Sequence, residues 1–373
     1  MTPFFEQRHR ALQESLRGLL LGAAAPFSAP EDFRAVARTM GEPLGLYRWL
    51  LPEDGPLDVR ALVLVREALA QVSPAADAIF AVQGLGSHPI ALAGTEAQRR
   101  EHLPSLRSGA RIGAFALTEP EAGSDVGAIA TLARKEPDGW VLDGEKTLIS
   151  NVGIADQYVV FANATPSLGK KGLTAFLVPS GAPGLREDPL EASAPHPLGR
   201  LTFTACRVPL ENILGAVGQG FRLAMDTLDA FRITVGGAAN GMAARALALS
   251  VAHVKKRRQF GAPLADQQML RGQLAELATE LEASRLLVAR AAHARDHGHA
   301  DAGTLAAMCK LFATESAFRA VDRAVQLHGG VGVLRGHPAE ALYREVRPLR
   351  IYEGTSEIQK LIIARSLLAG GAS

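Results

Sequence analysis

The chain has 373 residues, a formal net charge of +2 and a hydrophobic content of 47%. This length predicts two or three domains with sizeable apolar cores, and the balanced charge argues against nucleic acid or an anionic membrane as the main partner. No stretch reaches the roughly 18 apolar residues that cross a bilayer, so we expect no membrane span. Cys206 and Cys309 lie in no metal or redox spacing, which favours reduced side chains in a cytoplasmic protein.

Residues 1–112 predict an N-terminal helical domain. Apolar residues recur at spacings of three and four from Leu62 to Val72, as they do on one face of a helix. Further along, the segment 94–103 contains Thr95 as the expected N-cap, followed by Glu96 and a helix-forming run.

Residues 113–214 have a different pattern, which is typical of short strands. Apolar or alternating stretches such as 157–163 and 173–179 are separated by turn signals such as Pro137-Asp138-Gly139. Several short strands with a turn about every ten residues predict a small antiparallel β-barrel or sandwich.

Residues 215–373 predict an antiparallel helical bundle. A helix of about ten turns is expected from residue 220 onward, and its Gly236, Gly237 and Gly241 permit close approach of a neighbouring helix or ligand. A second helix carries an apolar stripe, and a third is expected over 302–327. The stripe consists of Leu274, Leu277, Leu281, Ser284 and Val288. The predicted fold class is therefore α+β, with helical, β and helical domains in that order.

Three motifs leave alternatives open. The segment 113–128 predicts a strand that ends in a polar rim, which suits either a heterocycle or phosphate ligand or a capped turn without a ligand. The basic run 255–258 suits either a solvated helix end or a phosphate contact. His293 and His297 lie one helical turn apart, but Ala294 takes the place of the acidic residue in the zinc-protease pattern, so we expect no metal site.

The stretch IYEGTSEIQK, residues 351–360, places a lone carboxylate just outside a predicted helix. Thr355 is expected to cap this helix, and Ile358, Leu361 and Ile362 are expected to face a core. Glu353 stands between an aromatic ring and Gly354, which is an unusual place for an ordinary solvated carboxylate.

Five ordered segments together resemble the acyl-CoA dehydrogenase family of flavoproteins. They are ALTEPEAGSDV, LDGEKTLISN, RRQFGAPLADQQ, QLHGGVG and RIYEGTSEIQK. The resemblance extends from about residue 40 to the C-terminus. It implies FAD as the cofactor, an acyl-CoA thioester as the substrate and the same helical–β–helical order that the sequence pattern predicts.

The resemblance implies a set of FAD contacts. Ser150 matches a hydroxyl residue that hydrogen-bonds the flavin, and Leu148 stands where many members have a tryptophan whose ring packs on the flavin. Two groups match contacts to the FAD of a neighbouring subunit: Arg257 and Phe260 with Gln268 close by, and Gln326, Gly329 and Gly330. The full set is Phe115, Leu117, Thr118, Gly123, Ser124, Leu148, Ser150, Arg257, Phe260, Gln268, Gln326, Gly329, Gly330 and Thr355.

The resemblance also implies that Glu353 is the catalytic base. It removes the α proton of the acyl-CoA while a hydride leaves the β carbon for FAD, which gives the trans-2-enoyl-CoA. Burial should raise the pKa of such a base. Some members carry the base on the long helix, where Phe231 stands here. The expected substrate contacts are Ser124, Arg232, Tyr352 and Gly354.

The implied partners are an electron-transfer flavoprotein and further copies of the chain in a homotetramer, a dimer of dimers. The implied process is fatty-acid β-oxidation. Two alternatives stay open: an oxygen-using relative, such as an acyl-CoA oxidase or a monooxygenase-like member, and a flavin-bound interaction protein without dehydrogenase activity. The segment LLPEDGPLD replaces the usual double-glycine segment, so the acyl-tail pocket is expected to differ.

Overall fold

The computed structural model describes residues 3–22, 27 and 32–370. The chain forms two compact units. The first comprises 1–29, 58–77 and 232–373, and the second comprises 30–57 and 78–231. Two of the boundaries, at 77/78 and 231/232, fall inside the helices α5 (Pro74–Ala93) and α7 (Gly220–Lys256). Within the described residues, no helix is long and apolar enough to cross a bilayer.

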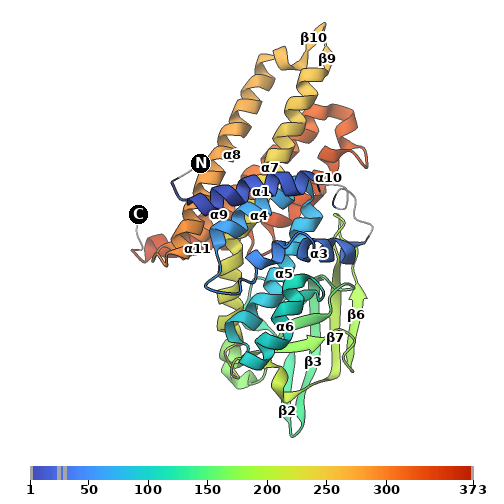
Figure 1. Cartoon of the computed structure of the whole chain (residues 1–373), viewed down its shortest axis with the longest axis vertical. Coiled ribbons are helices and arrows are strands. Elements are labelled where there is room, and N and C mark those ends of the chain that lie inside the picture. Colours follow the sequence, from blue (N-terminus) through green and yellow to red (C-terminus); the bar gives the residue numbers. More distant parts are fainter. Residues whose placement is uncertain (1–2, 23–26, 28–31, 371–373) are drawn as a thin grey trace. The chain divides into compact units, whose positions relative to one another are not determined.

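An eight-stranded sheet forms the centre of the second unit, with the strand order β6-β7-β3-β2-β4-β5-β8 and β1 beside β4 (Figure 1). Its strands are β1 (Gly113–Ala116), β2 (Leu132–Glu136), β3 (Gly139–Ser150), β4 (Gln157–Asn163), β5 (Leu173–Pro179), β6 (Leu185–Pro189), β7 (Leu198–Val208) and β8 (Ile213–Leu214). Alternate residues such as Trp140, Leu142 and Phe176 are buried in one apolar core.

The expectation of an antiparallel sheet is confirmed for most neighbours, but β2 pairs with β4 in parallel at Leu132 and Asn163, and β1 runs parallel to β4, with Phe115 paired to Val159. About forty residues separate these two strands, which is long enough for the crossover that a parallel pair needs. The sequence did not predict this pairing, because turn signals indicate how consecutive strands connect, and β1 and β4 are not consecutive in the chain.

Helices complete the second unit. Thr95 caps α6 in a reciprocal capping box with Gln98, as its position in the sequence predicts. Gln83 of α5 donates to the carbonyls of Leu106 and Arg111 at 2.8 and 2.9 Å and accepts from the N–H of Gly113 at 2.8 Å, which attaches α5 to the start of β1. The helical elements here are α3 (Phe33–Gly41), η1 (Leu46–Trp49), most of α5, α6 (Glu96–Ser108), η2 (Val126–Ala128), η3 (Pro166–Gly172), η4 (Leu210–Asn212) and the start of α7.

The first unit is a helical bundle in which α8 packs on α9, and α10 and α11 also pack on α9. Figure 1 shows the hairpin of β9 and β10 at the tip that joins α7 to α8. The elements are α1 (Gln7–Gly22), α4 (Val59–Val72), the rest of α7, β9 (Arg258–Gln259), β10 (Ala262–Pro263), η5 (Leu264–Asp266), α8 (Gln268–Asp296), α9 (Ala302–His328), η6 (Gly329–Val333), α10 (Pro338–Val346), η7 (Arg347–Arg350) and α11 (Ser356–Leu368).

The glycines of α7 allow the close helix packing that the sequence predicts. A Cβ at Gly236 would lie 2.5 Å from the Val288 side chain of α8, and a Cβ at Gly237 would lie 2.5 Å from the Val63 carbonyl oxygen of α4. Such distances exclude any larger residue without movement of a neighbour. The packing brings α4 against α7, which positions Arg66 of α4 beside Thr234 of α7.

Candidate active site

Glu353 has a strained backbone at the entrance to α11. Its φ is +52°, in the left-handed region that non-glycine residues rarely adopt, and Gly354 follows with φ +89°. Thr355 then caps α11 as predicted, because its hydroxyl oxygen accepts from the N–H of Ile358 at 3.3 Å. The two left-handed residues turn the chain sharply, and they hold Glu353 outside the helix.

Three side chains hold the carbonyls of this turn. Arg232 of α7 donates through Nε to the Glu353 carbonyl at 3.3 Å, and Lys310 of α9 donates through Nζ to the Gly354 carbonyl at 2.7 Å. Gln359 of α11 donates to the same Gly354 carbonyl at 2.9 Å. Hydrogen bonds from three different helices fix the position of the carboxylate-bearing residue.

One oxygen of the Glu353 carboxyl group is shielded from solvent, although the residue as a whole is half-buried. Its Oε2 is buried and has no hydrogen-bond partner among the described residues. Burial raises the pKa of Glu353 above its usual value, while the positive charges of Arg66, Arg232 and Lys310 act in the opposite direction. Burial also lowers the pKa of the Lys310 ammonium to about 8, against the attraction of Glu353. A carboxyl group with a raised pKa and a free buried oxygen is suited to accept a proton.

A fully buried ion pair lies next to this carboxyl group. Arg66 donates to both carboxylate oxygens of Asp77 at 2.8 Å and to the Thr234 hydroxyl at 2.9 Å. The guanidinium is therefore fixed from several sides, and its charge acts on Glu353 from a defined place.

We expect Gly354→Ala to slow flavin reduction by acyl-CoA by about tenfold or more, since left-handed strain costs roughly 1–3 kcal/mol. An added Cβ would also lie 2.5 Å from Nε2 of Gln359 and would displace the Glu353 turn. Stopped-flow absorbance of the FAD-loaded variant measures the rate. Gly298→Ala is the matched control, because Gly298 has φ +65° with open space around it. Equal rates for the two variants would contradict a specific role for Gly354.

In the second unit, the end of β1 lies beside β3 and carries two of the expected cofactor residues. The Thr118 carbonyl accepts from the N–H of Thr147 at 2.9 Å, and the Leu117 carbonyl accepts from Nζ of the fully buried Lys146 at 3.0 Å. Lys146 also pairs with Glu119 at 2.7 Å. Burial lowers the pKa of Lys146 to about 8. These bonds fix the backbone that leads out of β1.

A β-bulge in β3 determines where Leu148 and Ser150 lie. The pairing of β3 with β7 shifts between Lys146 and Ile149, and Leu148 has φ +55°. The Leu148 side chain is 60% exposed, which is unusual for a large apolar residue inside a strand. Ser150, two residues further on, is half-buried, and its hydroxyl lies 2.7 Å from Nε2 of His196.

The remaining expected FAD contacts of the second unit lie in β1 or in the segment that follows it. Phe115 is half-buried and its ring contacts Phe161, with the ring centroids 4.9 Å apart. Gly123 and Ser124 are exposed and directly follow the turn that the bridge between Glu119 and Ala122 closes. The segment after β1 is thus a capped turn, and its exposed residues are available to a ligand.

In the first unit, the other expected FAD contacts lie in two exposed regions, the β9–β10 hairpin and the end of α9. Arg257, Phe260 and Gln268 lie around the β9–β10 hairpin, and Phe260 is 97% exposed with φ +52°. Gln326, Gly329 and Gly330 are exposed at the end of α9. A large aromatic side chain that is almost fully exposed to solvent often marks a surface that contacts another molecule.

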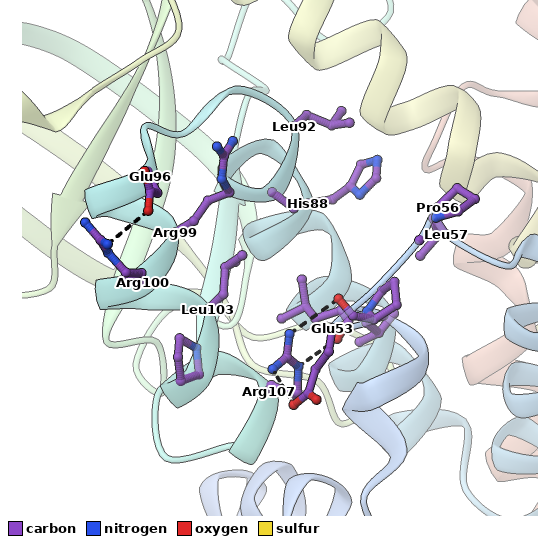
Figure 2. A pocket seen from close by; sticks show the side chains of 16 residues that line it. Glu53, Pro56, Leu57, His88, Leu92, Glu96, Arg99, Arg100, Leu103 and Arg107 are labelled. Atoms are coloured by element: carbon purple, nitrogen blue, oxygen red, sulfur yellow. Dashed lines mark hydrogen bonds and ion pairs between the residues drawn. The ribbon is translucent and has the colours of Figure 1, made fainter.

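A separate cavity of about 550 Å³ contains none of the predicted site residues (Figure 2). It lies between α5, α6 and the loop around Glu53. The arginines on its wall already have partners: Arg107 donates to the Leu51 carbonyl at 2.7 Å and pairs with Glu53, and Arg100 pairs with Glu96 (Figure 2). Arg99, the third arginine of this wall, donates to the neutral Gly94 carbonyl at 2.7 Å, so two of the three arginine charges are compensated by carboxylates.

No group of three or more metal-ligating side chains occurs in the described part of the chain. The sequence did not identify Arg66, Asp77, Lys310, Gln359 or His196 as residues of the site. One signal existed for Arg66, since it lies four residues after the buried Leu62 and therefore on the apolar stripe of α4. His196 lies between two prolines, and no local pattern connects it to Ser150.

Comparison with known proteins identifies the family. Residues 6–110, 114–206 and 218–368 match the N-terminal, middle and C-terminal domains of acyl-CoA dehydrogenase. The chain is 39% identical to the short-chain specific acyl-CoA dehydrogenase of Mus musculus over 97% of this chain and 90% of that protein. It is 42% identical to the NADH-dependent acryloyl-CoA reductase of Anaerotignum propionicum, over 79% and 76% of the two chains.

A solved structure gives the same result. Butyryl-CoA dehydrogenase from Megasphaera elsdenii superimposes with a TM-score of 0.91 at 32% identity, covering 99% of this chain and all of that one. Both sequence and fold agree over nearly the whole length. The chain therefore belongs to the acyl-CoA dehydrogenase family and is an FAD-dependent oxidoreductase that acts on acyl-CoA thioesters.

Proposed function

We propose that this protein converts an acyl-CoA to the trans-2-enoyl-CoA with Glu353 as the base that takes the α proton. The observation that carries the proposal is the buried Oε2 of Glu353, which has no partner in the described residues, on a carboxyl group whose pKa burial raises. An α C–H beside a thioester is a weak acid, and a solvated carboxylate is too weak a base for it. A desolvated carboxylate of raised pKa is better matched.

The surrounding residues hold this base in place. Arg232, Lys310 and Gln359 fix the carbonyls of the turn, and Gly354 removes the Cβ that would block it. As the α proton leaves, negative charge grows on the thioester oxygen, where we propose the Glu353 N–H as a donor. When bound, FAD supplies the acceptor for the hydride from the β carbon. Ser124, Arg232, Tyr352 and Gly354 are the proposed substrate contacts.

The second unit supports FAD binding. The exposed Leu148 offers an apolar face, and the Ser150 hydroxyl offers a polar atom two residues away. We propose that Arg257, Phe260, Gln268, Gln326, Gly329 and Gly330 contact the FAD of a neighbouring subunit in a homotetramer of three-domain subunits (1–112, 113–214 and 215–373). The other proposed contacts, made within the subunit, are Phe115, Leu117, Thr118, Gly123, Ser124, Leu148, Ser150 and Thr355.

The proposed substrate is a short straight-chain acyl-CoA, because the relatives named above act on short-chain acyl-CoA and butyryl-CoA. The proposed electron acceptor is an electron-transfer flavoprotein, and the proposed process is β-oxidation. The substrate is tested by anaerobic titration of the FAD-loaded protein with acyl-CoAs of about two to twelve carbons, a series that includes the four-carbon butyryl-CoA. We expect loss of flavin absorbance at short lengths and reoxidation by the acceptor flavoprotein. Rapid reoxidation by air would instead indicate an oxidase.

The similarity to acryloyl-CoA reductase favours one second function, reduction of a short 2-enoyl-CoA. The same residues would serve, with protonated Glu353 delivering the α proton, since the reverse reaction passes through the same transition state. Incubation of the chemically reduced protein with crotonyl-CoA distinguishes the two directions. If crotonyl-CoA reoxidises the reduced flavin faster than a saturated acyl-CoA reduces the oxidised flavin, the protein is a reductase.

The rate of flavin reduction should fall as the pH is lowered through the pKa of Glu353. Only the ionised carboxylate accepts a proton, and burial places this pKa above the usual 4.5, so the fall is expected at a higher pH than for a solvated glutamate. Lys310→Met removes a charge that lowers this pKa and should move the fall to still higher pH. Stopped-flow rates across the pH range measure both effects. A shift to lower pH in the variant would contradict the assignment.

A further inference from the structure

His196 contacts the proposed flavin-binding hydroxyl from the loop that precedes β7 in the second unit. Its Nε2 lies 2.7 Å from the Ser150 hydroxyl oxygen. The chain directly after His196 is attached to β3: the Asn151 N–H donates to the Pro197 carbonyl at 2.8 Å, and Ser150 pairs with Leu198 across β3 and β7. The pairing of β3 with β7 therefore places the His196 imidazole beside the Ser150 hydroxyl.

The other ring nitrogen shows which atom carries the hydrogen. Nδ1 of His196 is buried and has no partner among the residues described. A buried N–H without an acceptor is rarer in proteins than a buried acceptor without a donor. The favoured tautomer therefore carries its hydrogen on Nε2 and leaves Nδ1 as an unprotonated acceptor.

Charge on the ring is also disfavoured. Burial lowers the pKa of His196 to about 4, so the ring is neutral near pH 7. A neutral ring with its hydrogen on Nε2 donates that hydrogen to the Ser150 oxygen. The single hydroxyl hydrogen of Ser150 is then not used within the pair.

We propose that His196 is a positioning residue that fixes Ser150 as a hydrogen-bond donor to the bound flavin. The inference rests on the proposed contact between Ser150 and FAD. Without the histidine, the Ser150 hydroxyl can rotate about its Cβ–Oγ bond, and its hydrogen points toward the flavin only part of the time. The neighbouring Leu148, held outward by the bulge, does not constrain that rotation.

A double-mutant cycle with matched amides tests this role. In His196→Gln the side-chain amide reaches about as far as Nε2 and can still donate to Ser150, whereas in His196→Asn it reaches only about as far as Nδ1. The dissociation constant of FAD and its reduction midpoint potential are measured for these variants, for Ser150→Ala and for the Asn/Ala double variant.

We expect His196→Asn and Ser150→Ala each to weaken FAD binding by about tenfold, the value of one hydrogen bond. The double variant should be no weaker than either one, His196→Gln should restore binding, and the midpoint potential should follow the same pattern. Circular dichroism verifies that all variants are folded. Independent effects in the double variant, or wild-type behaviour in His196→Asn, would overturn the proposal. If acyl-CoA reduces the flavin of the wild type but the variants show no coupling between His196 and Ser150, only this inference is overturned. If the wild type does not bind FAD, the proposed function is overturned as well.

Discussion

Glu353→Gln should bind FAD and acyl-CoA but lose flavin absorbance at least about a hundredfold more slowly than the wild type, in the range of general-base contributions. The amide has nearly the same shape as the carboxyl group and keeps the turn at φ +52°. It cannot accept the α proton. Anaerobic stopped-flow mixing with a short-chain acyl-CoA measures the rate, and equilibrium titration measures binding separately.

The matched control is Glu357→Gln. This carboxylate lies in the first turn of α11, four residues after Glu353, but is exposed, and the local hydrogen bonds that act on it lower its pKa. The control should react at the wild-type rate. A Glu353→Gln variant that is reduced nearly as fast as the control would show that another group takes the proton.

Arg66→Met should lower the free energy of unfolding of the protein by about 3–5 kcal/mol, because it leaves a buried carboxylate without its partner. Both Arg66 and Asp77 are almost completely inaccessible to solvent, and Asp77 receives two hydrogen bonds of 2.8 Å from the guanidinium. Denaturant unfolding followed by circular dichroism measures the loss. The variant should also change the pH dependence of flavin reduction, since the Arg66 charge lowers the pKa of Glu353.

Two further variants test the cause of this loss. Arg66→Met combined with Asp77→Leu removes both charges and should recover most of the stability, as apolar replacements of buried pairs do. Arg100→Met breaks an exposed pair with Glu96 and should have no measurable effect. If the double variant were as unstable as Arg66→Met, the loss would come from packing and not from the unpaired charge.

The sequence predicted the local features of the site because they depend on neighbours in the chain. Thr355 caps α11, and the Glu353-Gly354 pair adopts the sharp turn that a glycine permits. The prediction for the helix face was only partly right. Leu361 is 60% exposed in this chain, whereas Ser356 and Gln359 are buried. These polar residues are buried because they hydrogen-bond Glu315 and the Glu353 turn.

The long-range features could not be predicted from patterns in the chain. The bulge that exposes Leu148 depends on the register between β3 and β7, which a single strand does not specify. The contact of His196 with Ser150 spans 46 positions. Arg66 lies on an apolar stripe, but only the fold shows that Asp77 compensates its charge. In each case a tertiary partner decides the role of the residue.

The most direct test of the account is anaerobic mixing of the FAD-loaded wild type with butyryl-CoA that carries either hydrogen or deuterium on its α carbon. We predict that the flavin absorbance disappears with both, and more slowly with deuterium, because Glu353 breaks the α C–H bond during reduction. Retention of the flavin colour with butyryl-CoA, or equal rates for the two forms at every pH, would contradict this role of Glu353.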